Sequence, residues 1–411
     1  MFHFGVRSFC RHQGSRRLVG SATARSSGSS PSLSSPAFVT DAARRGPEPG
    51  FRQTSSARPP NDIYPTNGPY LNYSMLYFDS IAFLLSNKLG IPAYIGGDGN
   101  CGKTPAHVAA HFNLSLRGAS ALLVSLCRMN VVQIKEDSDE SVDDIVYDLT
   151  PAAVKFLADN KSKSFFGTFA ETLTTNFITP DALLECARPQ EKKDIMSEHL
   201  EQNDDEVANN ARHFMNHMNS QSYCCAESLP DALGLRDLSE PKTLLDVGGG
   251  SAIYTIEAVK SNPNLSGVVF ELENIKPLTE EFVEEAGLSD RISVCPGDFF
   301  TEDFPKKMNY VLLSNILHDW PDETNLELIE KSYNCLEPGG QVIISELLLD
   351  DDVKNSTSAS TSMNIIMLPY TKGRQYRPKE LKLRLERLGF VNTRHIKLVD
   401  DYSLVVATKP Q

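Results

Sequence analysis

The segment Leu244-Leu245-Asp246-Val247-Gly248-Gly249-Gly250-Ser251-Ala252 reads as a buried strand that runs into a glycine turn and then into a helix. A turn of this kind leaves backbone N–H groups open at the helix N-terminus, which is the usual geometry for holding a nucleoside-type cofactor. A glycine turn alone is weak evidence. Its surroundings decide how it is interpreted.

The sequence around this turn alternates strands and helices. Strands are expected at 243–247, 267–271, 291–295, 309–314 and 340–346, with helices between them. Two consecutive strands, at 391–398 and 402–408, then flank Asp400-Asp401 and predict an antiparallel hairpin. We therefore predict an α/β fold with a doubly wound, seven-stranded sheet that closes with a C-terminal antiparallel hairpin.

Acidic residues follow the second and third predicted strands. Glu271 comes about twenty residues after the turn, where a carboxylate can accept hydrogen bonds from ribose hydroxyls. Asp298, in Gly297-Asp298-Phe299, can take an adenine amino group while Phe299 packs on the ring. Each acid taken singly is also typical of an exposed strand end, but their order on successive strands favours a cofactor site.

A histidine follows the fourth predicted strand. His318-Asp319-Trp320 comes directly after the apolar run 310–317, so the imidazole is expected at the same edge of the sheet as the glycine turn. A lone histidine after a strand is more often structural than catalytic. Beside a cofactor site, however, it is a candidate general base that takes a proton from a small substrate.

The composition limits the possible function classes. A chain of 411 residues with 40% hydrophobic content can form a large core, and its length favours two domains. The first sixty residues hold nine Arg against only Asp41 and Glu48, although acidic residues outnumber basic ones 53 to 40 overall. The rest of the chain is therefore strongly acidic, which argues against nucleic-acid binding.

Residues 1–60 differ from the rest. They are rich in Arg and Ser and have no apolar core segment, which favours a disordered mitochondrial transit peptide and linker, with an ordinary tail on a cytoplasmic protein as the alternative. The eight cysteines form no C-x-x-C and no zinc-type cluster, which favours a reducing compartment. No run approaches the roughly 20 apolar residues that a membrane span needs.

Residues 61–185 predict a mainly helical, winged-helix-like domain. One helix is expected to start at Thr104-Pro105 and another to run from Arg117 to Val132, before short strands at 134–135 and 145–147. The turn between these strands, 136–144, is acidic where a DNA reader needs Lys or Arg. We therefore prefer dimerisation to DNA binding as the role of this domain.

Residues 186–235 predict a helical linker before the C-terminal domain at 236–411. Phe214 and Met218 in the linker, with Met363 and Met367 further on, are candidates to line a pocket for a flat aromatic substrate. Bulky residues of this kind are as often simple core.

The chain from about 70 to 410 resembles the family that includes acetylserotonin O-methyltransferase, the plant caffeate and flavonoid O-methyltransferases, and bacterial enzymes acting on polyketides or pigments. The matching motifs are Leu245-Asp246-Val247-Gly248-Gly249-Gly250, Gly297-Asp298-Phe299-Phe300, Leu317-His318-Asp319-Trp320, Pro338-Gly339-Gly340, Glu346 and Arg384 to Phe390. The resemblance implies a homodimer that uses S-adenosylmethionine, with His318 as base and Glu346 orienting it.

Several residues depart from the family pattern. Ala252 replaces the last glycine of the turn, and Ser314-Asn315 stands near the cofactor where plant and animal members have Lys or Arg, which resembles the bacterial branch. Gln375 replaces an acid that assists the base in plant members.

These observations predict O-methylation of a small aromatic hydroxyl compound by a neutral His318 with an ordinary pKa of about 6.5. No Asp/Asn cluster of the kind that holds magnesium is evident, so no metal is expected. Two alternatives are a C-methyltransferase acting on a pigment or quinone precursor, and a non-catalytic binding partner with the same fold.

Overall fold

The computed structural model describes residues 68–97, 102–135, 145–175, 179–188, 204–399 and 401–411. The predicted presequence and the acidic turn 136–144 lie outside these residues. The N-terminal elements are α2 (Gly68–Leu89), α3 (Ile91–Gly96), α4 (Pro105–Phe112), α5 (Leu116–Arg128), β1 (Val132–Ile134), β2 (Tyr147–Leu149), α6 (Pro151–Leu157), α7 (Gly167–Thr175) and α8 (Pro180–Ala187).

The long helix α10 (Asp204–Leu233) leads into the C-terminal elements. These are η1 (Leu235–Asp237), β3 (Lys242–Val247), α11 (Ile253–Ser261), β4 (Leu265–Glu271), α12 (Lys276–Glu285), β5 (Ile292–Pro296), β6 (Met308–Ser314), η2 (Leu317–Asp319), α13 (Asp322–Cys335), β7 (Leu336–Glu346), η3 (Val353–Asn355), α14 (Ser358–Tyr370), α15 (Pro378–Arg387), β8 (Val391–Lys397) and β9 (Ser403–Thr408).

Seven strands form one sheet in the order β5-β4-β3-β6-β7-β9-β8. The five strands from β5 to β7 are parallel, whereas β9 runs antiparallel to both β7 and β8. This confirms the predicted seven-stranded sheet and its C-terminal hairpin. From β3 the chain adds β4 and β5 on one side of the sheet, and it then adds β6 and β7 on the other side. The carboxyl ends of β3 and β6 therefore border the switch point, which is where doubly wound sheets bind ligands.

Helices cover both faces of the sheet because successive strand residues point to opposite sides. Leu244, Leu312 and Ile343 pack with side chains of α10 and α11 on one face. Leu245, Val311 and Val342 pack with α13 and α15 on the other. Burial on both faces explains why these strands read as continuous apolar runs in the sequence.

The N-terminal part has a core of its own, formed by α3, α4, α5, α6, β1 and β2. As predicted, Thr104 caps α4, since its hydroxyl accepts the N–H of His107. The helix predicted from Arg117 to Val132 is wrong at its end: α5 ends at Arg128 and Val132 begins β1. Asn130, two residues after Arg128, adopts a left-handed φ of 59°, and a helix cannot continue through this conformation.

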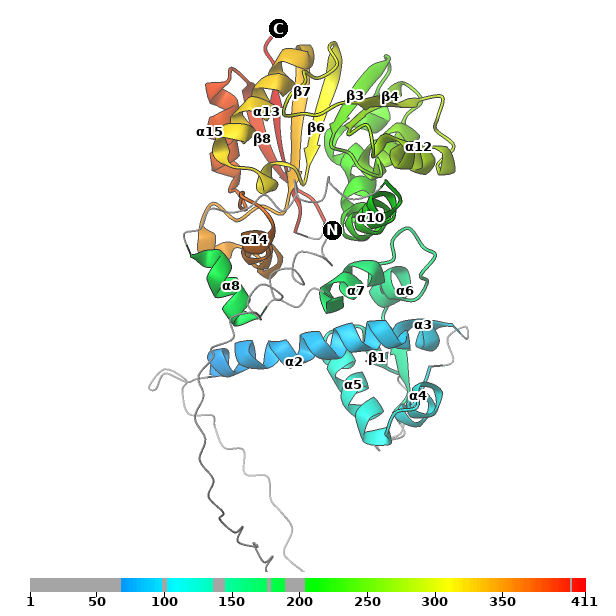
Figure 1. The fold of residues 1–411 in the computed structure, drawn as a ribbon. Helices are drawn as coiled ribbons and strands as arrows, with labels where there is room; N and C mark the ends of the chain where they lie inside the picture. The colour runs from blue at the N-terminus through cyan, green and yellow to red at the C-terminus, as the bar shows by residue number, and fades with distance from the viewer. Residues whose placement is uncertain (1–67, 98–101, 136–144, 176–178, 189–203, 400) are drawn as a thin grey trace, which may run out of the picture.

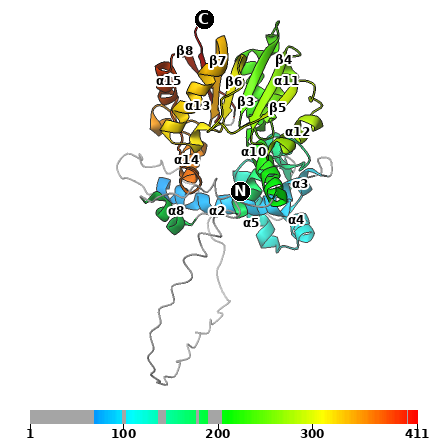
Figure 2. The same cartoon turned by 45° about the horizontal axis from the view of Figure 1, so that its top comes forward.

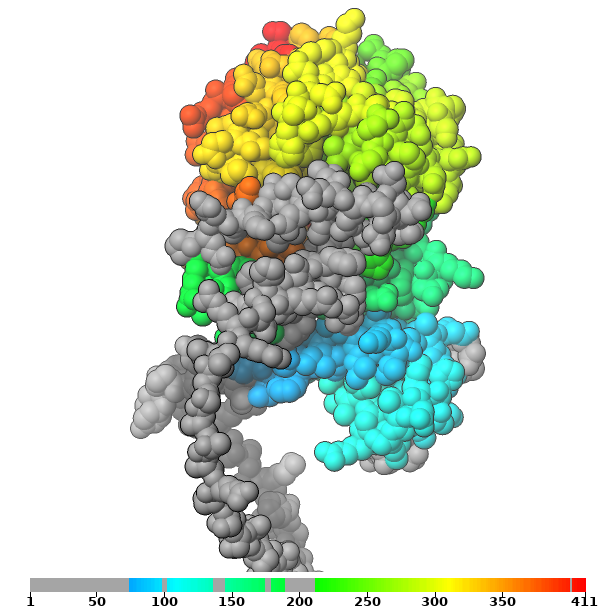
Figure 3. Space-filling model, viewed as in Figure 1, coloured from blue at the N-terminus to red at the C-terminus, as the bar shows by residue number. Residues whose placement is uncertain are grey.

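The sheet and helices α2 to α5 lie at opposite ends of the molecule (Figures 1 and 2), and Figure 1 shows α7, α8, α10 and α14 between them. Helix α2, blue in Figure 3, forms part of the surface. Within the described ranges, no helix combines the length and the hydropathy needed to cross a bilayer.

Candidate active site

The glycine turn joins β3 to α11 with three left-handed residues. Gly248, Gly250 and Ala252 have φ values of 64°, 54° and 59°. The turn is also tightly packed, because a Cβ on Gly249 would lie 2.7 Å from Cγ of Asp246. Only backbone can occupy this position, so the turn presents its amides next to the N-terminus of α11.

The predicted acid Glu271 lies beside the turn. Glu271 ends β4, and its two carboxylate oxygens accept the N–H groups of Gly250 at 3.0 Å and of Leu272 at 2.9 Å. Burial raises the pKa of Glu271, against the lowering effect of these two hydrogen bonds. Each oxygen keeps a further lone pair for a hydroxyl donor.

Asp246, on β3, packs against the glycine turn. It is buried, and it accepts a hydrogen bond from the Thr255 hydroxyl of α11 at 2.7 Å. Burial raises its pKa to about 6, with a further rise from the charge of Glu271, while the Thr255 bond lowers it. In this structure Asp246 ties the helix to the strand.

The loop after β5 carries the predicted Gly297-Asp298-Phe299. A Cβ on Gly297 would lie 2.4 Å from the ring of Phe270, so no larger residue fits. Asp298 accepts the N–H of Phe300 at 2.8 Å, and Phe299 packs edge-on against Phe300 and Trp320. The loop therefore reaches the turn that contains His318.

His318 lies in η2, directly after β6, and only 6% of its surface is exposed. Its Nδ1 lies 2.7 Å from Oε2 of Glu346, at the end of β7, and its Nε2 lies 3.5 Å from Oδ1 of Asp319. The other oxygen of Glu346 accepts the N–H groups of Leu317 at 3.0 Å and of His318 at 3.3 Å. One carboxylate thus contacts both the ring and the backbone of the histidine.

The pKa of His318 differs from the ordinary value used in the sequence analysis. Burial lowers the pKa, but the charges of Glu346 and Asp319 outweigh it and raise it to about 9. Burial also raises the pKa of Asp319 to about 6, with His318 lowering it and Glu346 raising it. The ordinary pKa was wrong because these carboxylates lie so close to the ring.

A segment after α14 completes the surroundings of His318. Gln375 is buried, and its Nε2 lies 3.3 Å from Nδ1 of His318. Gly373 packs directly on the histidine backbone, since a Cβ there would lie 2.0 Å from its carbonyl oxygen. Gln375 was a candidate from the sequence, whereas Gly373 was not, because nothing local in the sequence marks this long-range contact.

Ser314 and Asn315, predicted near the cofactor, end β6 and follow it. Asn315 has a left-handed φ of 52°, and its amide is engaged within the protein. It accepts a hydrogen bond from the Tyr402 hydroxyl at 3.0 Å and donates to Ser222 at 3.4 Å. A cofactor role for the pair stays a prediction.

The four predicted pocket residues lie on two helices below the carboxyl edge of the sheet (Figure 1). Phe214 and Met218 are half-buried on α10, whereas Met367 is buried on α14 and Met363 packs against the core on the α10–α11 face of the sheet. The residue beside the glycine turn is Met215, 3.8 Å from where a Gly250 Cβ would lie. A substrate-lining role for these residues stays a prediction.

No three His, Cys, Asp or Glu side chains among the described residues are placed to hold a metal ion.

The sheet order, the glycine turn after β3 and the acid ending β4 define a Rossmann-like fold of the methyltransferase class. Residues 196–391 match the family described as "O-methyltransferase domain", and this part of the chain is such a domain. S-adenosylmethionine is the methyl donor of this family.

Two curated bacterial relatives show the range of the family. The chain is 37% identical to 3-hydroxy-5-methyl-1-naphthoate 3-O-methyltransferase of Streptomyces sahachiroi over 39% of this chain and 46% of that protein. It is 34% identical to L-tyrosine C(3)-methyltransferase of Streptomyces lavendulae, over 48% and 54%. The chain spans about half the length of these relatives.

A solved structure supports the fold over a larger part of the chain than these two relatives cover. Human N-acetylserotonin methyltransferase in complex with S-adenosylmethionine superposes with a TM-score of 0.66. The superposition covers 85% of this chain and 100% of the human one at 20% sequence identity.

Proposed function

We propose that this protein is an S-adenosylmethionine-dependent O-methyltransferase that acts on a hydroxyl group of a small aromatic substrate, with His318 as general base and no metal. The observation that carries the proposal is the 2.7 Å contact between Nδ1 of His318 and Glu346, at the carboxyl edge of the sheet. A buried imidazole held by a carboxylate is suited to proton transfer rather than to simple packing.

The residues around the glycine turn fit the cofactor. The glycine turn, with its left-handed residues, leaves its backbone open because its glycines carry no side chains. The carboxylate of Glu271 has lone pairs for two ribose hydroxyls. Asp298 and Phe299 would hold the adenine. When bound, S-adenosylmethionine supplies a methyl group already activated by its sulfonium charge.

The chain's own contribution is to orient the acceptor and remove its proton. The contact of Nδ1 with Glu346 favours the tautomer that carries a proton on Nδ1, so Nε2 is the atom that accepts the hydroxyl proton. A pKa of about 9 brings His318 near the value of about 10 for a phenol, so the transfer between them is close to balanced. Glu346 then stabilises the imidazolium.

A homodimer is part of the proposal. Met75, Phe78, Ile81 and Leu85 recur at helical spacing on α2, and between 41% and 61% of each side chain is exposed. An exposed apolar stripe of this length marks an interaction surface in a soluble protein. A second copy of the chain is the occupant that we propose.

The activity is tested with labelled S-adenosylmethionine and a panel of hydroxynaphthoates, N-acetylserotonin and simple phenols, with mass spectrometry to locate the added methyl group. The proposal predicts label on a phenolic oxygen. Binding of S-adenosylhomocysteine without methylation of any member of the panel would contradict it and favour a non-catalytic role.

C-methylation is the second candidate, because one relative is named as a tyrosine C(3)-methyltransferase. The same base could take a proton from an activated ring. Including L-tyrosine in the panel separates the two reactions, since label on ring carbon and none on oxygen favours this alternative.

We also propose that residues 1–60 direct the protein to mitochondria, because they hold nine Arg and only two acids. A fusion of this segment to a fluorescent protein should enter mitochondria. Diffuse cytoplasmic fluorescence would refute the assignment.

A further inference from the structure

Asn325, on α13, lies under the turn that contains His318. It is 1% exposed, and its Nδ2 donates to the carbonyl oxygens of Leu317 at 2.8 Å and Trp320 at 3.1 Å. These two carbonyls bracket His318 and Asp319. Because an amide bonded to both ends of a short turn fixes its path, Asn325 limits how far the imidazole can move.

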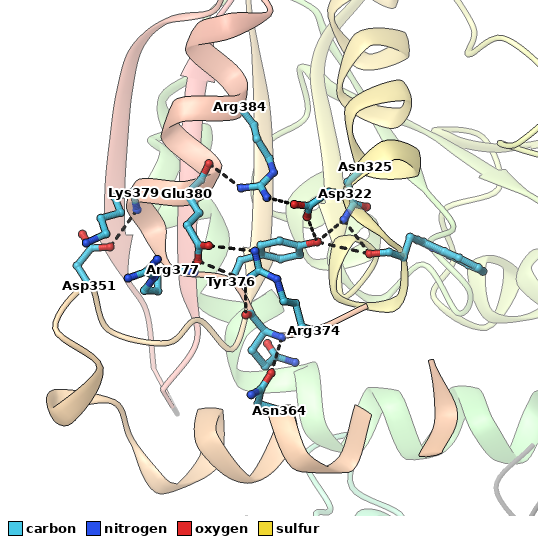
Figure 4. A network of polar contacts seen from close by, with 12 residues as sticks. Asp322, Asn325, Asp351, Asn364, Arg374, Tyr376, Arg377, Lys379, Glu380 and Arg384 are labelled. Carbon is cyan, nitrogen blue, oxygen red and sulfur yellow. Dashed lines mark hydrogen bonds and ion pairs between the residues drawn. The ribbon is translucent and has the colours of Figure 1, made fainter. Parts of the chain in front are cut away.

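The amide of Asn325 is itself held by a polar network (Figure 4). The Tyr376 hydroxyl lies 2.8 Å from Nδ2 of Asn325 and donates to Asp322 at 2.9 Å. Arg384 pairs with the same Asp322 at 2.6 Å, and its guanidinium lies 5.0 Å from the centre of the Tyr376 ring. Arg374 lies 4.3 Å from that ring centre, so the tyrosine contacts two cations.

The two sides of the histidine turn are therefore held differently. Glu346 binds the N–H groups of Leu317 and His318, whereas Asn325 binds carbonyl groups of the same turn. The charged groups recorded against the imidazole are Glu346 from β7 and Asp319 from the turn itself, and Gln375 adds a neutral amide. A shift of the turn would lengthen the contact between His318 and Glu346.

We propose that Asn325 is a positioning residue that keeps the imidazole of His318 within contact distance of Glu346, and that Tyr376 orients Asn325 for this task. The inference rests on the proposed role of His318 as base. It adds two residues from outside the histidine turn to the machinery that sets the strength of that base.

The chain offers a matched control in Asn262. Its Nδ2 donates to the carbonyl oxygens of Arg236 at 2.8 Å and Leu238 at 3.1 Å, and the residue is 3% exposed. Asn262 lies between α11 and β4, at the amino edge of the sheet and away from His318. The two asparagines thus make the same pair of bonds, and only one of them holds the histidine turn.

The test measures the imidazole pKa of His318 by NMR on protein labelled in histidine, with His318→Ala to assign the signal. This readout needs no methyl acceptor. Asn325→Ala should lower the pKa by about one unit or more, which is a tenfold change in proton affinity. Asn262→Ala should leave the pKa of His318 unchanged, although the melting temperature of this variant should fall by about as much as that of Asn325→Ala.

Tyr376→Phe keeps the ring and removes the hydroxyl, and it should lower the His318 pKa by a smaller amount. Tyr376→Phe also tests the proposal by itself if Asn325→Ala does not fold. A His318 pKa that is the same in wild type, Asn325→Ala and Tyr376→Phe would overturn the proposal, as would an equal fall in Asn262→Ala.

The positioning role and the proposed function can fail separately. If His318→Ala keeps wild-type methyl transfer to a hydroxynaphthoate, His318 is not the base, whatever the NMR shows. If that variant loses activity but Asn325→Ala keeps the wild-type His318 pKa, only the positioning role is refuted.

Discussion

At the scale of single residues, His318 and Glu346 meet at 2.7 Å although 28 positions separate them in the chain. His318 follows the carboxyl end of β6, and Glu346 is the last residue of the neighbouring parallel strand β7, which brings the two together. Family resemblance predicted the pair from the sequence. The raised pKa of His318 could not be predicted, because it depends on burial and on distances to two carboxylates.

The pKa of His318 predicts the pH dependence of methyl transfer. The base must be neutral to accept a proton, and its pKa is raised to about 9, so activity should be low near pH 7 and increase as the pH rises through about 9. The measurement is kcat/KM for a phenolic acceptor from pH 6 to 10. Glu346→Gln removes the charge that raises the pKa and should move the midpoint to lower pH. A midpoint near 6.5 in the wild-type protein would contradict this assignment.

Glu271 gives a prediction for the cofactor site. Glu271→Ala should weaken S-adenosylhomocysteine binding at least tenfold, because hydrogen bonds from hydroxyls to a carboxylate contribute about 1.5 to 3 kcal/mol each. Calorimetry measures the dissociation constant. Glu273→Ala, an exposed neighbour with the same charge change, should bind normally. Equal affinities for the two variants would remove Glu271 from the site.

At the scale of elements, the strands were predictable to within a few residues, since most of them are apolar runs ended by a glycine, an acid or a turn. The exception is β8, whose residues are largely exposed. The end of α5 was not, because it depends on the left-handed conformation of Asn130. The segment around Gly373 could not be predicted either. Its contact with the histidine turn joins parts of the chain 55 positions apart, and no local pattern records it.

Gly373 predicts an element-level effect. In Gly373→Ala the new methyl would overlap the carbonyl of His318, so the segment after α14 must move away from the turn. We expect a loss of about 1 to 3 kcal/mol in the free energy of unfolding, measured with urea, together with lower methyl transfer. Gly118→Ala adds the same methyl on α5, where it would meet only the Ser115 hydroxyl at 3.2 Å, and should cost little. Equal stabilities of the two variants would refute the tight packing at Gly373.

At the scale of the whole molecule, the chain combines a formal net charge of −13 with an apolar stripe that is exposed on α2. Repulsion between such acidic molecules opposes association in general, so a dimer needs a specific apolar surface to form. The stripe on α2 is the surface that we propose for this purpose.

The dimer proposal predicts the effect of a charge on this stripe. Phe78 is 61% exposed, and Phe78→Asp should shift the protein from dimer to monomer in light scattering coupled to size exclusion. Leu383→Asp, at a residue 60% exposed on α15, should leave the dimer intact. A monomeric wild-type protein, or a Phe78→Asp variant that stays dimeric, would argue against α2 as the interface.

The central claim is that His318 takes the hydroxyl proton during methyl transfer. Its most direct test is the single-turnover rate of methyl transfer to the best phenolic acceptor, for wild-type protein and His318→Ala, each saturated with S-adenosylmethionine. The proposal predicts a rate at least roughly 10²-fold lower in the variant, with unchanged affinity for S-adenosylhomocysteine. Equal rates in the two proteins would contradict it.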